Sequence, residues 1–203
     1  MLNSYSDKYF ENGYLWISYE DVLIETLLYG ITESEEITYD NLYQHSFYGA
    51  NIPISITSND TEIKEGYIAN IFNRDTKESE ILNEVAVSTN QYSKFEVYVN
   101  SKNGDTNINN MQKVAQTGLL NPGYNTIAIT PVILEGNQFS IVIKQTSIEE
   151  NVYFMIEAEV DDTFFANTTA NKGDSKVSTD GINWTDLADL GTIQYSGFDI
   201  DLS

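Results

Sequence analysis

Two acidic stretches near opposite ends of the chain carry residues that could bind a metal ion. SNDTEIKEG contains Asp60 and Glu62, and the terminal FDIDLS contains Asp199 and Asp201. Carboxylate oxygens suit Ca²⁺, which takes roughly six to eight such ligands. We predict that one such ion joins the early loop to the terminal strand. The alternative is that these side chains are solvated loop acids, because EF-hand spacing is absent.

Aromatic residues beside turns form the second set of candidates. Trp184 follows an Asp-Gly turn in STDGINWTDL, and Tyr92 and Tyr124 lie near other turns. An exposed aromatic ring can stack on the apolar face of a sugar. The three residues are therefore predicted ligand contacts, although Trp184 could instead anchor its turn against the core. Tyrosines within predicted strands are expected to pack in the core or in cross-strand pairs.

The charge and the absence of cysteine exclude several kinds of site. The chain has 31 Asp and Glu against 10 Lys and Arg, for a net charge of −21, and it contains no cysteine. Such a surface repels nucleic acid and anionic lipid, and disulfides, thiolate zinc sites and a cysteine nucleophile are ruled out within these residues. No apolar run approaches the roughly 20 residues of a membrane span. The start lacks the features of a signal peptide, so we expect any export signal to lie upstream.

Short strands separated by turn residues dominate the chain. Period-two alternation is clear in FEVYVNS and FSIVIKQ, and KNGD, NPG, EGN and TDG mark turns. Strands are predicted at 13–19, 41–50, 66–73, 80–89, 93–101, 111–118, 123–130, 138–146, 152–159, 175–179 and 192–202. This spacing without a long helix predicts an all-β fold, an antiparallel β-sandwich of the jelly-roll, carbohydrate-binding-module-like type.

The first 21 residues contain a motif of their own. NSYSDKYFENGYLWISYED, residues 3–21, resembles the end of the papain-like cysteine peptidase domain, in which an Asn-Ser-Trp-Gly segment supplies the Asn that orients the catalytic His. By this resemblance Asn3 matches the orienting Asn, whereas Tyr5 replaces the usual Trp. The family's Cys and His precede this segment and are absent. The one histidine, His45, follows the segment and is expected to be a packed or surface residue. Without a nucleophile and a base, Asn3 cannot activate anything alone.

Most of the remaining chain, residues 38–203, resembles the lectin-like domain that follows the papain-like domain in some secreted or wall-associated bacterial peptidases. The resemblance is carried in order by GYIANIF, EILNEVAVSTNQYSKFEVYV, LLNPGYNTIAITPVILEGNQFSIVIK and NKGDSKVSTDGINWTDL. It implies two parts, the last strands of a peptidase domain over 1–30 and a lectin-like β-sandwich over 38–203. Fold likeness by itself does not give a sugar specificity.

These observations predict a non-catalytic accessory module of a secreted or cell-wall cysteine peptidase. Its partners would be the papain-like domain and a cell-surface glycan, with no nucleic acid and no membrane span. One alternative is a purely structural module that works through protein contacts alone. Another is a fragment that complements a peptidase lacking this segment. The sugar, the identity of the metal and the oligomeric state are not encoded in any motif of this sequence.

Overall fold

The computed structural model describes most of the chain after residue 38. The described residues are 39–45, 49–50, 52–55, 63–74, 78–148, 151–160, 171–190, 192–195 and 198–201. The chain divides into two units, Met1–Leu42 and Tyr43–Ser203, and the fold below is that of the second unit. The predicted strand at 13–19, Asn3, Asp60 and Glu62 lie outside the described residues.

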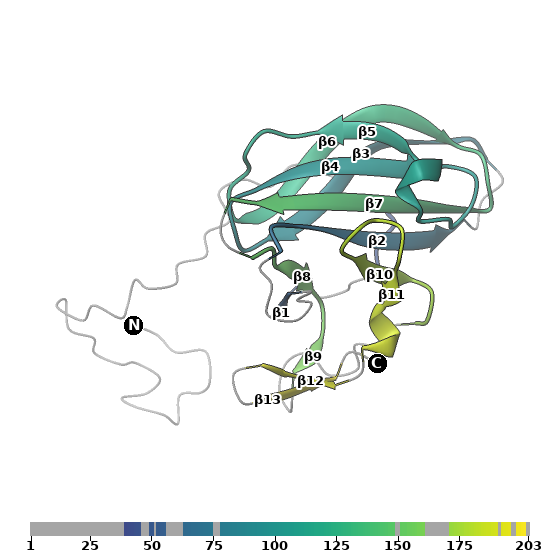
Figure 1. Ribbon diagram of the computed structural model, residues 1–203. Coiled ribbons are helices and arrows are strands. Elements are labelled where there is room, and N and C mark those ends of the chain that lie inside the picture. Colours follow the sequence, from purple (N-terminus) through teal and green to yellow (C-terminus); the bar gives the residue numbers. More distant parts are fainter. Residues whose placement is uncertain are drawn as a thin grey trace, which may run out of the picture. The chain divides into compact units, whose positions relative to one another are not determined.

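Antiparallel sheets form the whole of the described fold (Figure 1). The largest sheet has six strands in the order β11-β10-β2-β7-β4-β5, and smaller sheets join β3 to β6, β1 to β8, and β12-β13-β9. The strands are β1 (Ile52–Ile54), β2 (Glu65–Asn73), β3 (Glu80–Thr89), β4 (Ser93–Asn100), β5 (Gln112–Gln116), β6 (Gly123–Leu134), β7 (Gln138–Ser147), β8 (Phe154–Ile156), β9 (Glu159–Val160), β10 (Ser175–Ser178), β11 (Thr185–Asp186), β12 (Thr192–Tyr195) and β13 (Phe198–Asp201). Two short 3₁₀ turns, η1 (Ile108–Asn110) and η2 (Leu187–Asp189), are the only helical elements in the described ranges.

The core lies between the six-stranded sheet and the two smaller sheets β3–β6 and β1–β8. Alternation on β4 turns Phe95, Val97 and Val99 inward, where they pack with residues of β3, β5, β6 and β7. A second cluster packs β1 and β8 against Val177 of β10, with Ile68 of β2 against both clusters. Period-two side chains therefore fix which face of each strand is buried.

Most of the sequence predictions for this region are confirmed. The fold is all-β and antiparallel, and strands predicted at 66–73, 80–89, 93–101 and 138–146 match β2, β3, β4 and β7 within a residue at each end. The segment predicted at 152–159 forms two strands, β8 and β9. The jelly-roll assignment, the peptidase-like part at 1–30 and the boundaries of the 38–203 domain remain predictions. Within the described residues, no helix is long and apolar enough to cross a membrane.

One strand prediction is wrong, and another predicted strand is divided in two. Residues 41–45 and 49–50 form no strand, because Tyr43 turns inward and packs edge-on against Phe139 at a centroid distance of 4.9 Å. The predicted strand at 192–202 forms two antiparallel strands, β12 and β13, in which Thr192 pairs with Asp201 and Tyr195 with Phe198.

A buried arginine links the β2–β3 and β6–β7 connections, by which the chain passes between the two sheets at one end of the fold. Arg74 follows β2, and its guanidinium forms an ion pair with Glu80 at the start of β3, with side chains only 5% and 11% exposed. Its Nη1 donates to the carbonyls of Leu134 at 2.9 Å and Gly136 at 2.8 Å, in the β6–β7 turn. The Tyr43 hydroxyl donates to the Glu80 carboxylate at 3.0 Å. Arg74 Nη2 donates to the Glu78 carbonyl at 2.7 Å, in the β2–β3 connection, so one side chain satisfies backbone acceptors in two connections between the sheets.

We expect Arg74→Met to lower the free energy of unfolding by about 3 kcal/mol, because it leaves the Glu80 charge buried without its cation. Urea unfolding followed by circular dichroism measures this. Lys102→Met is the matched control, since the Lys102–Glu135 pair is 70% and 58% exposed and its loss should cost less than about 0.5 kcal/mol. Equal losses in the two variants would contradict a structural role for the buried pair.

Candidate functional site

Three loops meet at the end of the sheets opposite Arg74. They are the β3–β4 turn, the β5–β6 loop and the segment after β7. Ser93 forms a β-bridge with Leu120, the Ile148 amide donates to the Tyr92 carbonyl at 3.3 Å, and Thr89 pairs with Gly123. Four large apolar or aromatic side chains are exposed on these loops: Tyr92 (46%), Leu119 (48%), Tyr124 (74%) and Ile148 (56%). We call these four residues the loop-end patch.

The residues of the loop-end patch lie in stretches of sequence that contain no Asp or Glu. Residues 85–95, 106–134 and 136–148 contain no Asp or Glu, although the whole chain contains 31. Glu149 and Glu150 follow Ile148 in the sequence and lie outside the described residues. An apolar and aromatic surface without carboxylates can bind a weakly polar ring without first stripping water from a charged group.

A buried polar network lies beneath the loop-end patch and holds its loops. Gln145 of β7, 1% exposed, donates from Nε2 to the hydroxyls of Thr89 at 3.2 Å and Ser93 at 3.0 Å. Gln91 donates from Nε2 to the Asn151 carbonyl at 2.8 Å and accepts from the Tyr153 amide at 2.8 Å. These bonds connect the β3–β4 turn to β7 and to the segment after it.

The β5–β6 loop is fixed by bonds of its own. The Thr117 hydroxyl accepts from the Phe95 amide at 3.0 Å and donates to the Gly118 carbonyl at 2.8 Å. Gly123, at the start of β6, has a φ of 127°, a conformation that favours glycine. Asn125 donates from Nδ2 to the carbonyls of Asn121 and Gly123, both at 3.1 Å. The loops that present the exposed rings are therefore preorganised.

The structure brings together two of the three predicted ligand contacts. Tyr92 and Tyr124 flank the Thr89–Gly123 pair and are both exposed. Trp184 lies on the β10–β11 hairpin, and β10, β2 and β7 separate that hairpin's edge strand from β4. Its side chain is partly buried, and its indole N–H is shielded from solvent with no acceptor among the described residues. This placement favours the alternative in which Trp184 anchors its turn.

The turn before Trp184 is stabilised by an aspartate. The Asp180 carboxylate accepts from the amides of Asn183 at 2.7 Å and Ile182 at 2.8 Å, and from the Asn183 side chain at 2.7 Å. These hydrogen bonds hold the pKa of Asp180 far below its ordinary value. The acid in this segment thus has a local structural role.

The predicted metal ligands are not tested by the described side chains. Asp199 and Asp201 lie on β13, whose backbone alone is described. Among the side chains that the structure does describe, no three His, Asp or Glu residues are grouped as metal ligands.

His45 is packed, as predicted. Its ring stacks on Phe72 at a centroid distance of 4.5 Å, and its Nε2 donates to the Ile71 carbonyl at 2.8 Å. Its Nδ1 lies 3.7 Å from the Asp174 carboxylate. Both ring nitrogens thus face groups of the fold itself.

Comparison with known proteins gives a family and a fold. The family model described as "Lectin like domain" matches residues 42–198. The clostridial cysteine protease Cwp84 after propeptide cleavage is similar at 22% identity and a TM-score of 0.66, over 98% of this chain and 49% of that chain. The cysteine protease and lectin-like domains of Cwp84, a surface layer associated protein of Clostridium difficile, are similar at 23% identity and a TM-score of 0.53, over 61% of this chain and 28% of that one. This chain therefore spans half or less of these solved chains. The comparison with curated proteins gives no match.

We expect Gln91→Ala to remove both bonds to the 151–153 segment and to lower the free energy of unfolding by about 1–3 kcal/mol. Hydrogen exchange at the Tyr153 amide should accelerate, because this amide donates to the Gln91 side chain. Gln112→Ala on the exposed face of β5 is the control and should change neither quantity. Unchanged exchange at Tyr153 in the Gln91 variant would show that the network does not hold this segment.

Proposed function

The chain belongs to the lectin-like domain family, and we propose that it is a non-catalytic accessory module whose loop-end patch binds a glycan. The observation that carries the proposal is the convergence of Tyr92 and Tyr124, both exposed, on rigid loops without acidic residues. The sequence contains no cysteine, so the chain has no thiol nucleophile of its own.

The proposed setting is a secreted or cell-wall-associated cysteine peptidase of the papain family. Cwp84 combines cysteine protease and lectin-like domains and is a surface layer associated protein, which supports such a setting for this chain. The resemblance of residues 1–30 to the end of a papain-like domain, with Asn3 in place of the orienting Asn, agrees with it. The partner would be the papain-like domain. Complementation of a peptidase that lacks this segment is the weaker alternative, since Tyr5 departs from the family motif.

Stacking is the mechanism by which the loop-end patch would act. The C–H groups of a sugar face are weakly positive, and the π-face of a tyrosine ring is negative. Hydrogen bonds of Gln91, Thr117 and Asn125 already order the loops, so binding would cost little further conformational entropy.

A second function is favoured by another surface of the chain. On the outward face of the β3–β6 sheet, Ile81 and Ile133 are directly opposite each other and are 56% and 57% exposed. Such a cross-strand pair could pack against the peptidase domain in a module that binds no glycan.

The two functions are separated by paired variants of the full chain. We expect Tyr92→Ala with Tyr124→Ala to weaken glycan binding about tenfold or more, since two stacked rings are lost. Ile81→Ser with Ile133→Ser should leave it unchanged. The measurement is a glycan array followed by calorimetric titration of any sugar that binds.

The same two variants would then be tested for binding to a separately produced papain-like domain. Under the docking alternative, only the isoleucine variant loses this interaction. The proposed glycan binding would be overturned if no glycan on the array bound the chain and if binding to the peptidase domain depended on the isoleucines. Thermal unfolding shows whether each variant folds.

We also propose a structural Ca²⁺ held by Asp60, Glu62, Asp199 and Asp201. Calcium at about 100 times its Kd should stabilise the chain by about 2.7 kcal/mol, which raises the unfolding midpoint by several degrees relative to EDTA. Asp60→Asn with Asp201→Asn should abolish this shift. Asp189→Asn, at an exposed pair with Lys172, should retain it. Equal midpoints in Ca²⁺ and in EDTA would contradict the proposal.

A further inference from the structure

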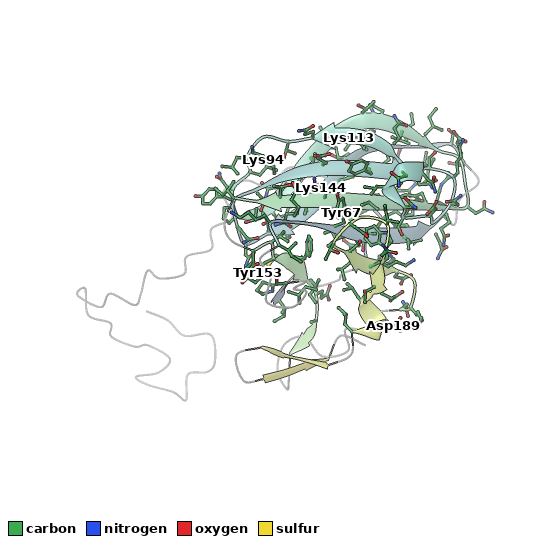
Figure 2. All side chains as sticks on the ribbon, in the orientation of Figure 1. Tyr67, Lys94, Lys113, Lys144, Tyr153 and Asp189 are labelled. Atoms are coloured by element: carbon green, nitrogen blue, oxygen red, sulfur yellow. The ribbon has the colours of Figure 1, made fainter. Side chains whose placement is uncertain are left out.

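The side of the six-stranded sheet opposite Phe95, Val97 and Val99 is partly covered by other segments, and its uncovered part carries a group of lysines on neighbouring strands. On β4, Lys94 lies opposite Thr146 of β7 and Glu96 lies opposite Lys144, while Tyr98 lies opposite Lys113 of β5. Directly paired residues of an antiparallel sheet point to the same side, and so do residues two apart on one strand. The three lysines therefore share one face, which we call the lysine face (Figure 2).

Tyrosines and two carboxylates hold two of these lysines in place. Lys144 Nζ lies 2.8 Å from Glu65 and 5.9 Å from the centre of the Tyr67 ring. Lys113 Nζ lies 2.6 Å from Glu96, whose Oε2 also accepts from the Tyr98 hydroxyl at 2.7 Å. The hydrogen bonds from Lys113 and Tyr98 place the pKa of Glu96 below its ordinary value. The ammonium groups are thus oriented before any ligand arrives.

This surface departs from the charge of the rest of the chain. The whole sequence has about three acidic residues for each basic one, whereas β2, β4, β5 and β7 together carry three lysines and two glutamates. Lys94 has no ion-pair partner among the described residues, and its side chain is exposed. Charges are screened beyond about 8 Å at physiological salt, so a ligand on this face is affected mainly by these three lysines and by Glu65 and Glu96, which pair with two of them, and less by acids elsewhere on the chain.

We propose that the lysine face binds an anionic glycan, a saccharide that carries carboxylate or phosphate groups. The ammonium groups of Lys94, Lys113 and Lys144 meet the acidic groups, and the rings of Tyr67 and Tyr98 lie among them as surfaces for the sugar. A bilayer fits this face less well, because none of the exposed large apolar side chains in the described ranges lies on β2, β4, β5 or β7. This site is separate from the loop-end patch and does not depend on it.

The test titrates the full chain with a galacturonic acid tetrasaccharide and observes the amide resonances by NMR. Lys94→Gln, Lys113→Gln and Lys144→Gln combined should weaken binding about tenfold. The matched control combines Lys64→Gln, Lys102→Gln and Lys172→Gln, which changes the net charge equally, and it should bind as the unaltered chain does. Tyr92→Ala with Tyr124→Ala should also leave this binding intact, so failure of the loop-end patch as a glycan site is distinguished from failure here.

Two further arms test the sign of the charge and the source of the ligand. Glu65→Gln with Glu96→Gln should strengthen binding several-fold, and the methyl-esterified tetrasaccharide should not shift the amide resonances of β4, β5 and β7 around the lysine face. Weaker binding in the glutamate variant, or equal loss in both lysine triples, would overturn the proposal. The proposal would also be overturned if the unaltered chain did not bind the acidic tetrasaccharide but bound phosphatidylglycerol vesicles through the same three lysines.

Discussion

Where the chain passes from one packed sheet to the other, its backbone N–H and C=O groups lose their cross-strand hydrogen-bond partners. The packing of the two sheets therefore depends on other groups that satisfy them. At one end of this fold the Arg74 guanidinium supplies them, with Glu80 as its counterion and carbonyls of the β6–β7 turn as acceptors. This side chain joins the β2–β3 and β6–β7 crossings, so it helps to set the β3–β6 pair over β4 and β7. The position of the opposite loops follows from that alignment.

The opposite end uses neutral amides for the same purpose. Gln91 and Gln145 connect the β3–β4 turn to β7 and to the segment after it without burying a charge. The Gln145 Oε1 is buried and has no partner among the described residues, which marks this network as less completely satisfied than the Arg74 site. Because the polar anchors lie inside, the exposed positions of these loops are free to carry Tyr92, Leu119, Tyr124 and Ile148.

Strands with clear alternation were predictable because one buried face fixes their period, as β3, β4 and β7 show. The segment at 41–45 was misjudged, since its aromatic composition comes from Tyr43 packing on Phe139 and not from a ladder. Tyr92 and Tyr124 could be identified as loop residues from their neighbouring turn residues. That the two tyrosines lie close together could not be predicted, because it depends on the pairing of Thr89 in β3 with Gly123 in β6, two residues 34 positions apart in the sequence. The lysine face was missed for the same reason: Lys94, Lys113 and Lys144 come from three separate strands.

The loop-end patch and the lysine face have one feature in common: neither carries the excess of acidic residues found in the rest of the chain. A net charge of −21 repels polyanions wherever carboxylates are close, so an anionic ligand can approach only where they are sparse or paired. Lys94 follows Tyr92 by two residues, at the point where β4 leaves the β3–β4 turn. The two proposed sites are therefore neighbours along β4, with aromatic rings at the turn and ammonium groups on the strand. Stacking is insensitive to salt and charge pairing is weakened by it, so binding at the two sites would respond differently to ionic strength.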